Sequence, residues 1–332
     1  MNNILSRLNK NQKDQLSEEK FPDKFPPMLA TLSHDYFSDD NWIFERKWDG
    51  ERALASRRGN QVQLFSRKGK DITSSYPEIR DGLKNQFSPD YLIDGEIVAF
   101  DGKTSSFSKL QHRMQLTDEK EISESGIKVF YYVFDIVHLD GYSLRKLPLR
   151  ERKSILKKLL IYEEVVRFTP HRNGSGESYH NEACKKGWEG IIAKEADSEY
   201  VSSRSKKWLK FKCVNQQEFV IGGFTDPEGE RKGFGALLIG FYEKDKLQYA
   251  GKVGTGYDDK TLEKLRHKMD RLTQQQNPFE QQEIKEKHIH FISPKLVCEV
   301  GFTEWTNDDK LRHPRFLGLR DDKNPEYVRK EK

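Results

Sequence analysis

The chain has 332 residues, of which 33% are charged and 35% apolar, and it carries a formal net charge of +5. This length predicts about two domains, and an aromatic content of 11% with a small net charge argues against a disordered chain. The longest apolar-rich run, 129–137, is far shorter than the ~20 residues that span a bilayer, and the N-terminus lacks the apolar region of a secretion signal. Cys184, Cys213 and Cys298 are widely spaced, which predicts neither a disulfide framework nor a zinc site, so we expect a cytoplasmic protein.

The first two thirds of the chain predict a mixed domain. Residues 1–25 are polar, and we expect them to form a flexible N-terminal tail. Over 26–214 strand-like and helical patterns alternate, and several connections are too short for crossover helices, so the fold class is α+β with mainly antiparallel sheets. The predicted strands are 42–47, 52–57, 61–66, 91–100, 129–139, 190–194 and 208–213, and the predicted helices are 76–85, 107–113, 149–161 and 180–186.

The last third of the chain has a different sequence pattern, with shorter predicted strands. Glycine-rich and charge-rich turns separate short strand-like runs at 218–223, 236–242 and 247–253, and a helical pattern at 258–272 precedes a strand at 295–305. Several short strands with one helix between them predict a small OB-fold β-barrel over 215–332.

The positive charge is concentrated in the first domain. From residue 215 onward 21 basic and 21 acidic residues cancel, so the whole excess lies in 1–214. The basic run SRSKKWLKFK contains Lys210 and Lys212, and we expect its lysines to face one side of a strand and Trp208 and Phe211 the other. A row of lysines on one face suits an anionic ligand such as a phosphate, although such a run is also typical of a solvated surface.

The segment KWDGER, from Lys47 to Arg52, stands out as a candidate nucleophile site. A lysine between a strand and a glycine turn can be held rigidly, and its amine becomes nucleophilic when burial or neighbouring cations lower its pKa. Walker-A, GxGxxG, HExxH and GxSxG patterns are all absent from the sequence. Taken alone, the segment is equally well read as a strand–turn–strand hairpin.

Four further motifs follow in order. They are Asp94-Gly-Glu96 at the end of an apolar strand, Tyr132-Val-Phe134-Asp135 within another, Glu189-Gly-Ile-Ile192-Ala-Lys194, and Lys210-Phe-Lys212. Together with KWDGER, the series resembles the nucleotidyltransferase motifs of ATP-dependent DNA ligases, RNA ligases and mRNA capping enzymes. The segments VCEVGFTEWT (297–306) and PRFLGLRDDK (314–323) are similar to the ligase domain of bacterial LigD-type end-joining ligases.

The resemblance extends from about Pro26 to Val328 and implies an adenylation (nucleotidyltransferase) domain followed by an OB-fold domain. It implies that Lys47 attacks the α-phosphorus of ATP and holds AMP as a phosphoramidate. The residues that it implies around the nucleotide are Glu45 beside the adenine, Phe134 and Ile192 on the two faces of the base, Arg52 and Glu96 at the ribose, Arg67 at the nucleotide or nick phosphate, and Lys210 and Lys212 at the α-phosphate.

The resemblance also implies a metal and a moving second domain. Glu189, with Glu96, would bind Mg²⁺ or Mn²⁺, for which carboxylate oxygens are suitable ligands. Arg320 and Lys323 would contact the leaving pyrophosphate from the OB-fold domain, which implies closure about a hinge at 213–217.

The function implied is an ATP-dependent DNA ligase that seals 5′-phosphate/3′-hydroxyl nicks in DNA repair or end joining. Its implied partners are nicked or broken duplex DNA, a Ku-like end-binding protein and a separate polymerase or nuclease, with no membrane, and we expect a monomer at the bacterial nucleoid. An RNA ligase or capping-type enzyme, and a binding module with a vestigial pocket, remain alternatives, as do a stand-alone enzyme and a fragment of a larger one. Glu51 replaces the aromatic residue common in the family, and we expect it to face solvent or DNA.

Overall fold

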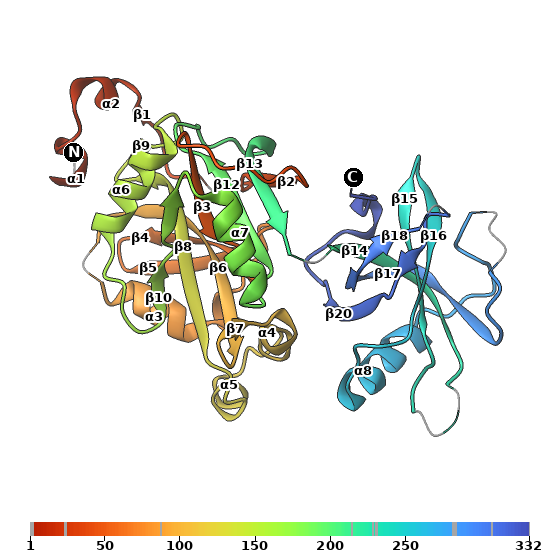
Figure 1. Cartoon of the computed structure of the whole chain (residues 1–332). Helices are drawn as coiled ribbons and strands as arrows, with labels where there is room; N and C mark the ends of the chain where they lie inside the picture. Colours follow the sequence, from red (N-terminus) through yellow and green to blue (C-terminus); the bar gives the residue numbers. More distant parts are fainter. Residues whose placement is uncertain are drawn as a thin grey trace. The chain divides into compact units, whose positions relative to one another are not determined.

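The computed structural model describes residues 3–22, 25–86, 88–213, 215–227, 229, 232–280, 284–306 and 308–331. The chain divides into two units, Met1–Cys213 and Val214–Lys332 (Figure 1). Within the described ranges, no helix is both long enough and apolar enough to cross a membrane.

Unit 1 contains two sheets. The larger has the strand order β1-β9-β8-β6-β4-β5, with β7 beside β6 and β10 beside β8, and all of its pairs except β8–β10 are antiparallel. Its strands are β1 (Ser17–Glu18), β4 (Glu51–Arg58), β5 (Gln61–Ser66), β6 (Tyr91–Asp101), β7 (Thr104–Ser105), β8 (Val129–Leu139), β9 (Tyr142–Ser143) and β10 (Val166–Phe168).

The second sheet has the order β11-β3-β12-β13-β2, in which only β13–β2 is parallel. Its strands are β2 (Leu29–Leu32), β3 (Trp42–Arg46), β11 (His171–Asn173), β12 (Gly190–Glu195) and β13 (Arg204–Lys212). The helices of unit 1 are α1 (Asn3–Ser6), α2 (Lys10–Asp14), α3 (Pro77–Lys84), α4 (Phe107–Met114), α5 (Glu119–Glu124), α6 (Leu149–Leu159) and α7 (Gly176–Lys185), with a 3₁₀ turn at Thr73–Ser75.

Local sequence signals begin several of these helices. Pro77 occupies the first turn of α3, where its missing N–H costs no hydrogen bond. The side chains of Ser106 and Asp118 accept hydrogen bonds from backbone N–H groups in the first turns of α4 and α5. These caps satisfy donors that the helices themselves leave unpaired.

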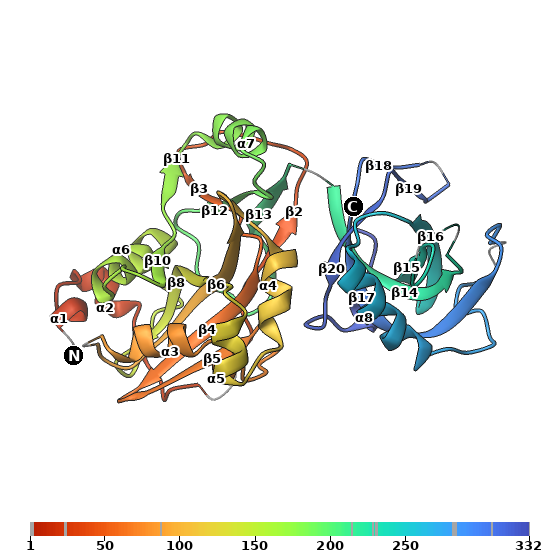
Figure 2. The same cartoon turned by 90° about the horizontal axis from the view of Figure 1, so that it is seen from below.

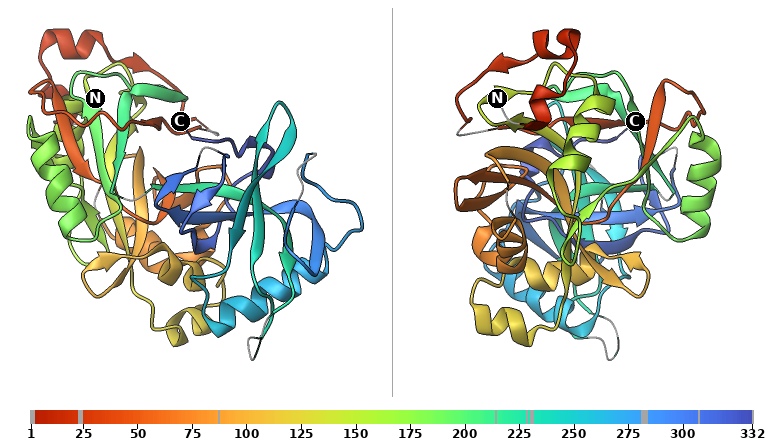
Figure 3. Two further views of the ribbon diagram at one scale, coloured as in Figure 1. Left: turned by 45° about the vertical axis from the view of Figure 1, so that its right-hand side comes forward. Right: turned by 90° about the vertical axis from the view of Figure 1, so that its left-hand side faces the viewer.

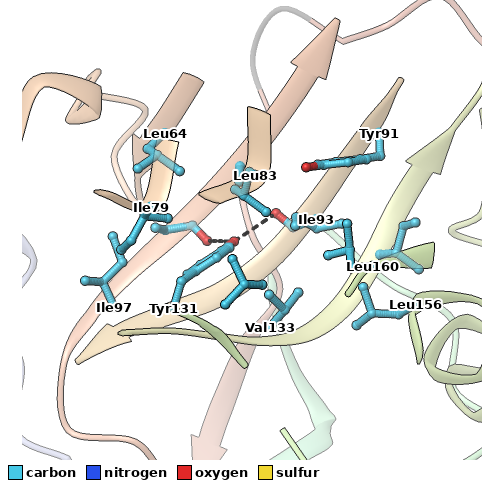
Figure 4. Packing of buried hydrophobic residues seen from close by; sticks show 14 of the residues in the cluster. Leu64, Ile79, Leu83, Tyr91, Ile93, Ile97, Tyr131, Val133, Leu156 and Leu160 are labelled. Atoms are coloured by element: carbon cyan, nitrogen blue, oxygen red, sulfur yellow. Dashed lines mark hydrogen bonds between the residues drawn. The ribbon is translucent and has the colours of Figure 1, made fainter. Parts of the chain in front are cut away.

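Helices α3, α4 and α6 cover one face of the large sheet and form the main core of unit 1. Figure 4 shows part of this core, with labelled side chains from the sheet, α3 and α6. Ile79 and Leu83 from α3 and Leu156 from α6 are buried against strand residues such as Ile93. The hydroxyl of Tyr131 lies within this core and donates to the backbone oxygen of Ala53 at 3.0 Å, which satisfies a polar group that burial would otherwise penalise.

The two sheets of unit 1 pack against each other through the other face of the large sheet. Leu54, Leu92 and Phe134 from the large sheet form one cluster with Ile43 and Trp208 from the second sheet. The outer face of the second sheet is covered by α7, which lies along it in Figure 2. Unit 1 therefore has four layers: helices, sheet, sheet and helix α7.

The strand pairing corrects the predicted faces of β13. Trp208, Lys210 and Lys212 have the same parity, so they share the inner face of the second sheet, whereas Leu209 and Phe211 point to α7. The prediction that Trp208 points to the face opposite the lysines is wrong, because every second side chain along a strand points to the same face.

The N-terminal segment is also more ordered than expected. Leu5 in α1 is fully buried in the main core, and β1 pairs with β9 through Ser17 and Glu18. Much of the segment expected to be a flexible tail therefore packs onto unit 1.

Unit 2 contains a five-stranded antiparallel sheet with the order β16-β15-β14-β17-β20 and a two-stranded sheet of β18 and β19. Helix α8 follows β16 in the chain and packs through Leu262, Leu265 and Met269 onto the core of the sheet (Figure 3). Along the five-stranded sheet, three strands, the helix and two further strands follow in chain order, as in the predicted OB-fold, and β18 and β19 lie between the last two in the chain. The elements are β14 (Asn215–Thr225), β15 (Leu237–Glu243), β16 (Lys246–Val253), α8 (Asp259–Asp270), β17 (Ile289–Phe302), β18 (Glu304–Trp305), β19 (Leu311–Arg312), β20 (Arg315–Leu319) and a 3₁₀ turn, Pro325–Tyr327.

The cysteines differ from the prediction. Cys184 at the end of α7 and Cys213 at the end of unit 1 form a disulfide, whereas Cys298 is buried in the core of unit 2. Sequence spacing did not reveal the pair, because β12 and β13 fold back along α7 and bring together residues 29 positions apart.

Candidate active site

The segment that carries Lys47 is fixed at both ends. The backbone N–H of Lys47 donates to the carbonyl of Gly190 at 3.0 Å, which joins the end of β3 to the start of β12. The Trp48 ring stacks on Tyr132 with centroids 3.7 Å apart. A side chain at Gly50 would collide with the backbone oxygen of Ile97, so only glycine allows β4 to start so close to β6.

The amine of Lys47 forms an ion pair with the carboxylate of Glu189. The Lys47 side chain is 20% exposed, whereas the Glu189 side chain is only 6% exposed. Gly190 has a φ of +147° and lies against the backbone of Phe211, which explains the glycine that follows the acid in this motif. The predicted nucleophile and the predicted metal ligand are therefore neighbours.

The inner face of the second sheet brings several further predicted residues together. Ile192 is paired with Glu45 on β3 and with Lys210 on β13, and Gly190 is paired with Lys212. Because side chains on paired positions point to the same face, Glu45, Ile192, Lys210 and Lys212 share the face that is turned to the large sheet. The predicted phosphate lysines therefore lie on the same face as the strand positions that lead into Lys47 and Glu189.

The Glu45 carboxylate is held by two lysines. Lys153 from α6 and Lys194 from β12 both form ion pairs with it, the second at 2.6 Å, and all three side chains are only 2% exposed. Burial opposes ionisation of Glu45, but the two lysines outweigh it and lower its pKa. Burial lowers the pKa of Lys194 to about 8, although Glu45 opposes this shift.

Arg52 forms a second buried network. Its guanidinium binds both carboxylate oxygens of Asp94 at 2.6 Å, and the hydroxyl of Tyr200 donates to the same carboxylate at 2.6 Å. Burial disfavours the charged guanidinium, but Asp94 reverses this and raises the pKa of Arg52. Glu96 lies directly opposite Arg52 on β6, so the two residues assigned to the ribose are cross-strand neighbours.

The Phe134 ring lies close to two cationic side chains and to the Trp208 ring. The centre of its ring lies 4.7 Å from the Arg52 guanidinium carbon and 4.3 Å from the Lys194 nitrogen. Lys194 also lies 4.0 Å from the Trp208 ring. Ile192 has the same parity on β12 as Lys194, so it shares the sheet face that turns toward Phe134.

Arg67 and Glu51 are placed by the β4–β5 hairpin. Ser66 pairs with Ala53, so Arg67 follows at the level of Arg52 in the turn after β5. Glu51 is 7% exposed and accepts a 2.6 Å hydrogen bond from the hydroxyl of Tyr76. The expectation that Glu51 faces solvent or DNA is therefore wrong, because this hydrogen bond stabilises it in the interior.

In unit 2, Arg320 and Lys323 lie among acidic side chains. Arg320 binds Glu299 at 2.5 Å and Asp322 at 2.9 Å, and Lys323 binds Glu218 at 2.5 Å. Burial raises the pKa of Asp322, but Arg320 outweighs this effect and lowers it to about 2. The two cations assigned to pyrophosphate are thus neighbours held by carboxylates of their own unit.

Comparison with known families identifies the chain. The model of the ATP-dependent DNA ligase domain matches residues 27–212, and that of the ATP-dependent DNA ligase C-terminal region matches 230–323. The chain belongs to the ATP-dependent DNA ligase family.

Individual relatives agree with this assignment. The chain is 36% identical to the multifunctional non-homologous end joining protein LigD of Mycolicibacterium smegmatis and 33% identical to that of Pseudomonas aeruginosa. These matches cover 92% and 94% of the chain but 40% and 37% of the relatives. The chain therefore spans about two fifths of the length of these multifunctional relatives.

A solved structure supports the fold. A mycobacterial DNA ligase D complexed with ATP and MES has a TM-score of 0.70 and 34% identity, over 93% of this chain and 99% of that one. The nucleotidyltransferase domain and the OB-fold domain expected from the sequence are thus confirmed.

Unit 2 of this ligase-family chain has a basic surface that the balanced charge of 215–332 concealed. Basic residue types recur along one face of α8 and at its C-cap, and they line a pocket together with Glu263: Lys260, Lys264, His267, Lys268 and Arg271. Burial and the nearby charge of Lys268 lower the pKa of Lys264, which shows how closely the cations are placed. Helix α8 therefore carries a local basic cluster.

The supporting residues of the site were not predicted from the sequence. Lys153, Asp94 and Tyr200 bind predicted site residues directly, yet none was assigned a role. Asp94 and Lys194 lie inside quoted motifs and could have been found there, whereas Lys153 and Tyr200 carry no motif signal.

Proposed function

We propose that the chain is an ATP-dependent DNA ligase that seals 5′-phosphate/3′-hydroxyl nicks through a covalent lysyl-AMP. The observation that carries the proposal is the ion pair of Lys47 with Glu189, beside a sheet face that carries Lys210 and Lys212. Nucleotidyl transfer depends mainly on positioning and on neutralising phosphate charge, and this arrangement supplies both.

The first chemical step uses Lys47 as nucleophile. Its neutral amine forms a bond to the α-phosphorus of ATP, the bond from that phosphorus to the bridging oxygen breaks, and pyrophosphate leaves while the amine proton is released. Glu189 orients the amine before attack, and Lys210 and Lys212 would hold the α-phosphate oxygens. AMP would then pass to the 5′-phosphate of the nick, and the 3′-hydroxyl would displace it.

The base would bind between Phe134 and Ile192, since adenine recognition by stacking needs an aromatic or aliphatic wall on each face. Arg52 and Glu96 are cross-strand neighbours suited to the ribose hydroxyls, and Arg67 lies at the same level. The Glu45 carboxylate already binds two lysines. We infer that Glu45 supports the adenine site indirectly, because these ion pairs hold β3 in place.

Glu189 and Glu96 are the proposed ligands of a divalent cation. Both offer carboxylate oxygens, which Mg²⁺ or Mn²⁺ prefers, and Mg²⁺ commonly takes one or two carboxylates together with substrate phosphates. Such an ion would neutralise charge on the α-phosphate.

Labelled ATP and a nicked duplex test the proposal together. We expect the protein to form an acid-labile AMP adduct that pyrophosphate reverses, and to seal a 5′-phosphorylated nick in DNA. Failure to form the adduct with either Mg²⁺ or Mn²⁺ contradicts the chemistry, whereas sealing of nicked RNA but not of DNA contradicts the substrate assignment.

We also propose a role in end joining, which the names of the LigD relatives support. In this role the substrate is broken or nicked duplex DNA, and a Ku-like protein and a polymerase or nuclease are separate partners. We propose that the enzyme works as a monomer in the cytoplasm, at the bacterial nucleoid.

Arg320→Ala is expected to reduce self-adenylation by about 10²-fold and to affect the sealing of a pre-adenylated nick much less. The reason is that Arg320 would contact pyrophosphate only in the first step. Rates of adduct formation and of sealing pre-adenylated DNA measure the two effects. Arg312→Ala, at an exposed arginine paired with Glu304, is the matched control, and equal loss in both steps by Arg320→Ala contradicts the assigned role.

The double variant Lys260→Ala/Lys264→Ala is expected to weaken binding to nicked duplex DNA while leaving adduct formation intact. If each lysine neutralises one phosphate, the slope of log affinity against log salt falls by about 1.8 in magnitude. Fluorescence anisotropy over a salt series measures it. The control is Lys244→Ala/Lys246→Ala in the β15–β16 turn, and a similar slope change in both double variants contradicts a specific role for α8.

A further inference from the structure

The disulfide of unit 1 lies where the second sheet leads into unit 2. Cys184 is in the last turn of α7, and Cys213 directly follows β13 as the final residue of unit 1. Their Cα atoms are 5.1 Å apart, within the usual range for bonded cysteines, and both residues are only partly buried. The bond therefore lies between residues that are near the surface and not in the core.

The same chain segment contacts the proposed catalytic residues. The backbone N–H of Cys213 donates to the carbonyl of Glu189 at 3.0 Å. The preceding carbonyl, of Lys212, accepts a 3.3 Å hydrogen bond from Tyr36 and lies 3.2 Å from the His180 ring nitrogen. The disulfide thus ties α7 to a segment that carries Lys212 and is bonded to Glu189.

We propose that Cys184 and Cys213 are a reversible dithiol–disulfide site that fastens the end of β13, with Lys212, to α7. Disulfides are rare in reducing cytoplasm, so in the proposed location this bridge would form and break with the redox state. The assignment of the chain to its family does not depend on this disulfide, so the redox site is a separate property of the chain.

The oxidant would be a low-molecular-weight disulfide. The thiolate of one cysteine attacks a sulfur of this disulfide and releases one small thiolate, giving a mixed disulfide. The thiolate of the second cysteine then attacks the protein sulfur of the mixed disulfide and releases the second small thiolate. The two protein thiols lose two electrons, the small disulfide gains them, and the two thiol protons pass to the released thiolates.

His180 makes metal binding the competing interpretation. Its ring nitrogen lies 3.5 Å from the Cys184 sulfur, and a ligand atom from each of His180, Cys184 and Cys213 falls within 4.8 Å of the others. Two thiolates and an imidazole suit zinc. The structure favours the redox site, because its two sulfurs are bonded to each other.

Thiol counting on the full-length protein tests the site. After equilibration with reduced and oxidised glutathione, the protein is alkylated in denaturant, which also exposes the buried Cys298. Intact-mass spectrometry is then expected to show two protected cysteines in the oxidised form, with a mass about 2 Da lower before alkylation. Cys184→Ser and Cys213→Ser are each expected to abolish the protection, and Cys298→Ser to preserve it. Alkylation of both cysteines across all redox ratios overturns the proposal, as does one zinc per chain that prevents oxidation.

Hydrogen exchange and adenylation test the consequence. The Cys213 amide is expected to exchange more slowly in the oxidised protein. The effect on catalysis rests on the proposed function: self-adenylation, which would use Lys212 and Glu189, is expected to slow by roughly fivefold or more on oxidation. Unchanged exchange, or equal adenylation rates in the two forms, overturns control of the end of β13. A missing AMP adduct in both forms instead rejects the ligase function and leaves the thiol result intact.

Discussion

Lys47→Ala is expected to form no AMP adduct with labelled ATP and to seal no nick. Removing the amine removes the atom that would bond to the α-phosphorus, and the neighbouring lysines cannot replace it because they lie on different strand positions. Loss of a covalent nucleophile typically costs several orders of magnitude in rate. Gel detection of the adduct and a nick-sealing assay measure the effect. The sealing of pre-adenylated DNA should survive in part, since that step does not require the lysyl-AMP.

Lys207→Ala is the matched control for this experiment. Lys207 lies on β13, is 58% exposed and pairs with Glu195, so it samples the same basic run away from the inner face. It is expected to retain adduct formation. An adduct on the Lys47→Ala protein contradicts the assignment of the nucleophile, as does equal loss in the two variants.

Glu45→Gln is expected to lower the free energy of unfolding of unit 1 by about 3–5 kcal/mol. The substitution leaves the buried ammonium groups of Lys153 and Lys194 without the charge that compensates them. Four of the five tryptophans lie in unit 1, so the shift in the urea midpoint of tryptophan fluorescence reports mainly on this unit. Adduct formation is expected to fall with it, because β3 carries the chain into Lys47.

Glu182→Gln is the control that shows, in the same assay, how much the effect of losing a carboxylate charge depends on burial. Glu182 also binds two cations, Arg172 and Lys186, but it does so on the exposed surface of α7. Water screens such pairs, so the variant is expected to unfold at nearly the wild-type urea concentration. Similar destabilisation by the two substitutions contradicts the argument that the buried position of Glu45 makes its lysine pairs important.

Much of the fold was accessible from local patterns. The long strands β6 and β8 and the helices α3, α4 and α8 begin and end within one or two residues of the predicted ranges, since they have clear periodicity or caps. The short strands β2, β10 and β11 escaped prediction. They have three or four residues, too few for a period to show, and they exist because longer strands pair with them.

The site divides in the same way. The motif residues were found because their chemistry and order are visible in the sequence, and pairing places Glu45, Ile192, Lys210 and Lys212 on one face. The residues that hold them were not found, because their role comes from a distant partner. Lys153 is 108 residues from Glu45, and Tyr200 is 106 residues from Asp94.

The sequence by itself determined the two-domain organisation, the candidate nucleophile Lys47 and the family resemblance, since composition and motif order are local properties. Only the tertiary structure decided which side chains are buried and what they bind. Glu51 turned out to be internal, Trp208 shares the face of the lysines, Leu5 belongs to the core, and Cys213 lies beside Cys184. The net charge of +5 did not show where the positive side chains gather. Strand pairing places Lys210 and Lys212 on one face, and helix periodicity places the lysines of α8 on another. The energy of a charged side chain depends on the distance to its neighbours and on its burial, and both are decided only by folding.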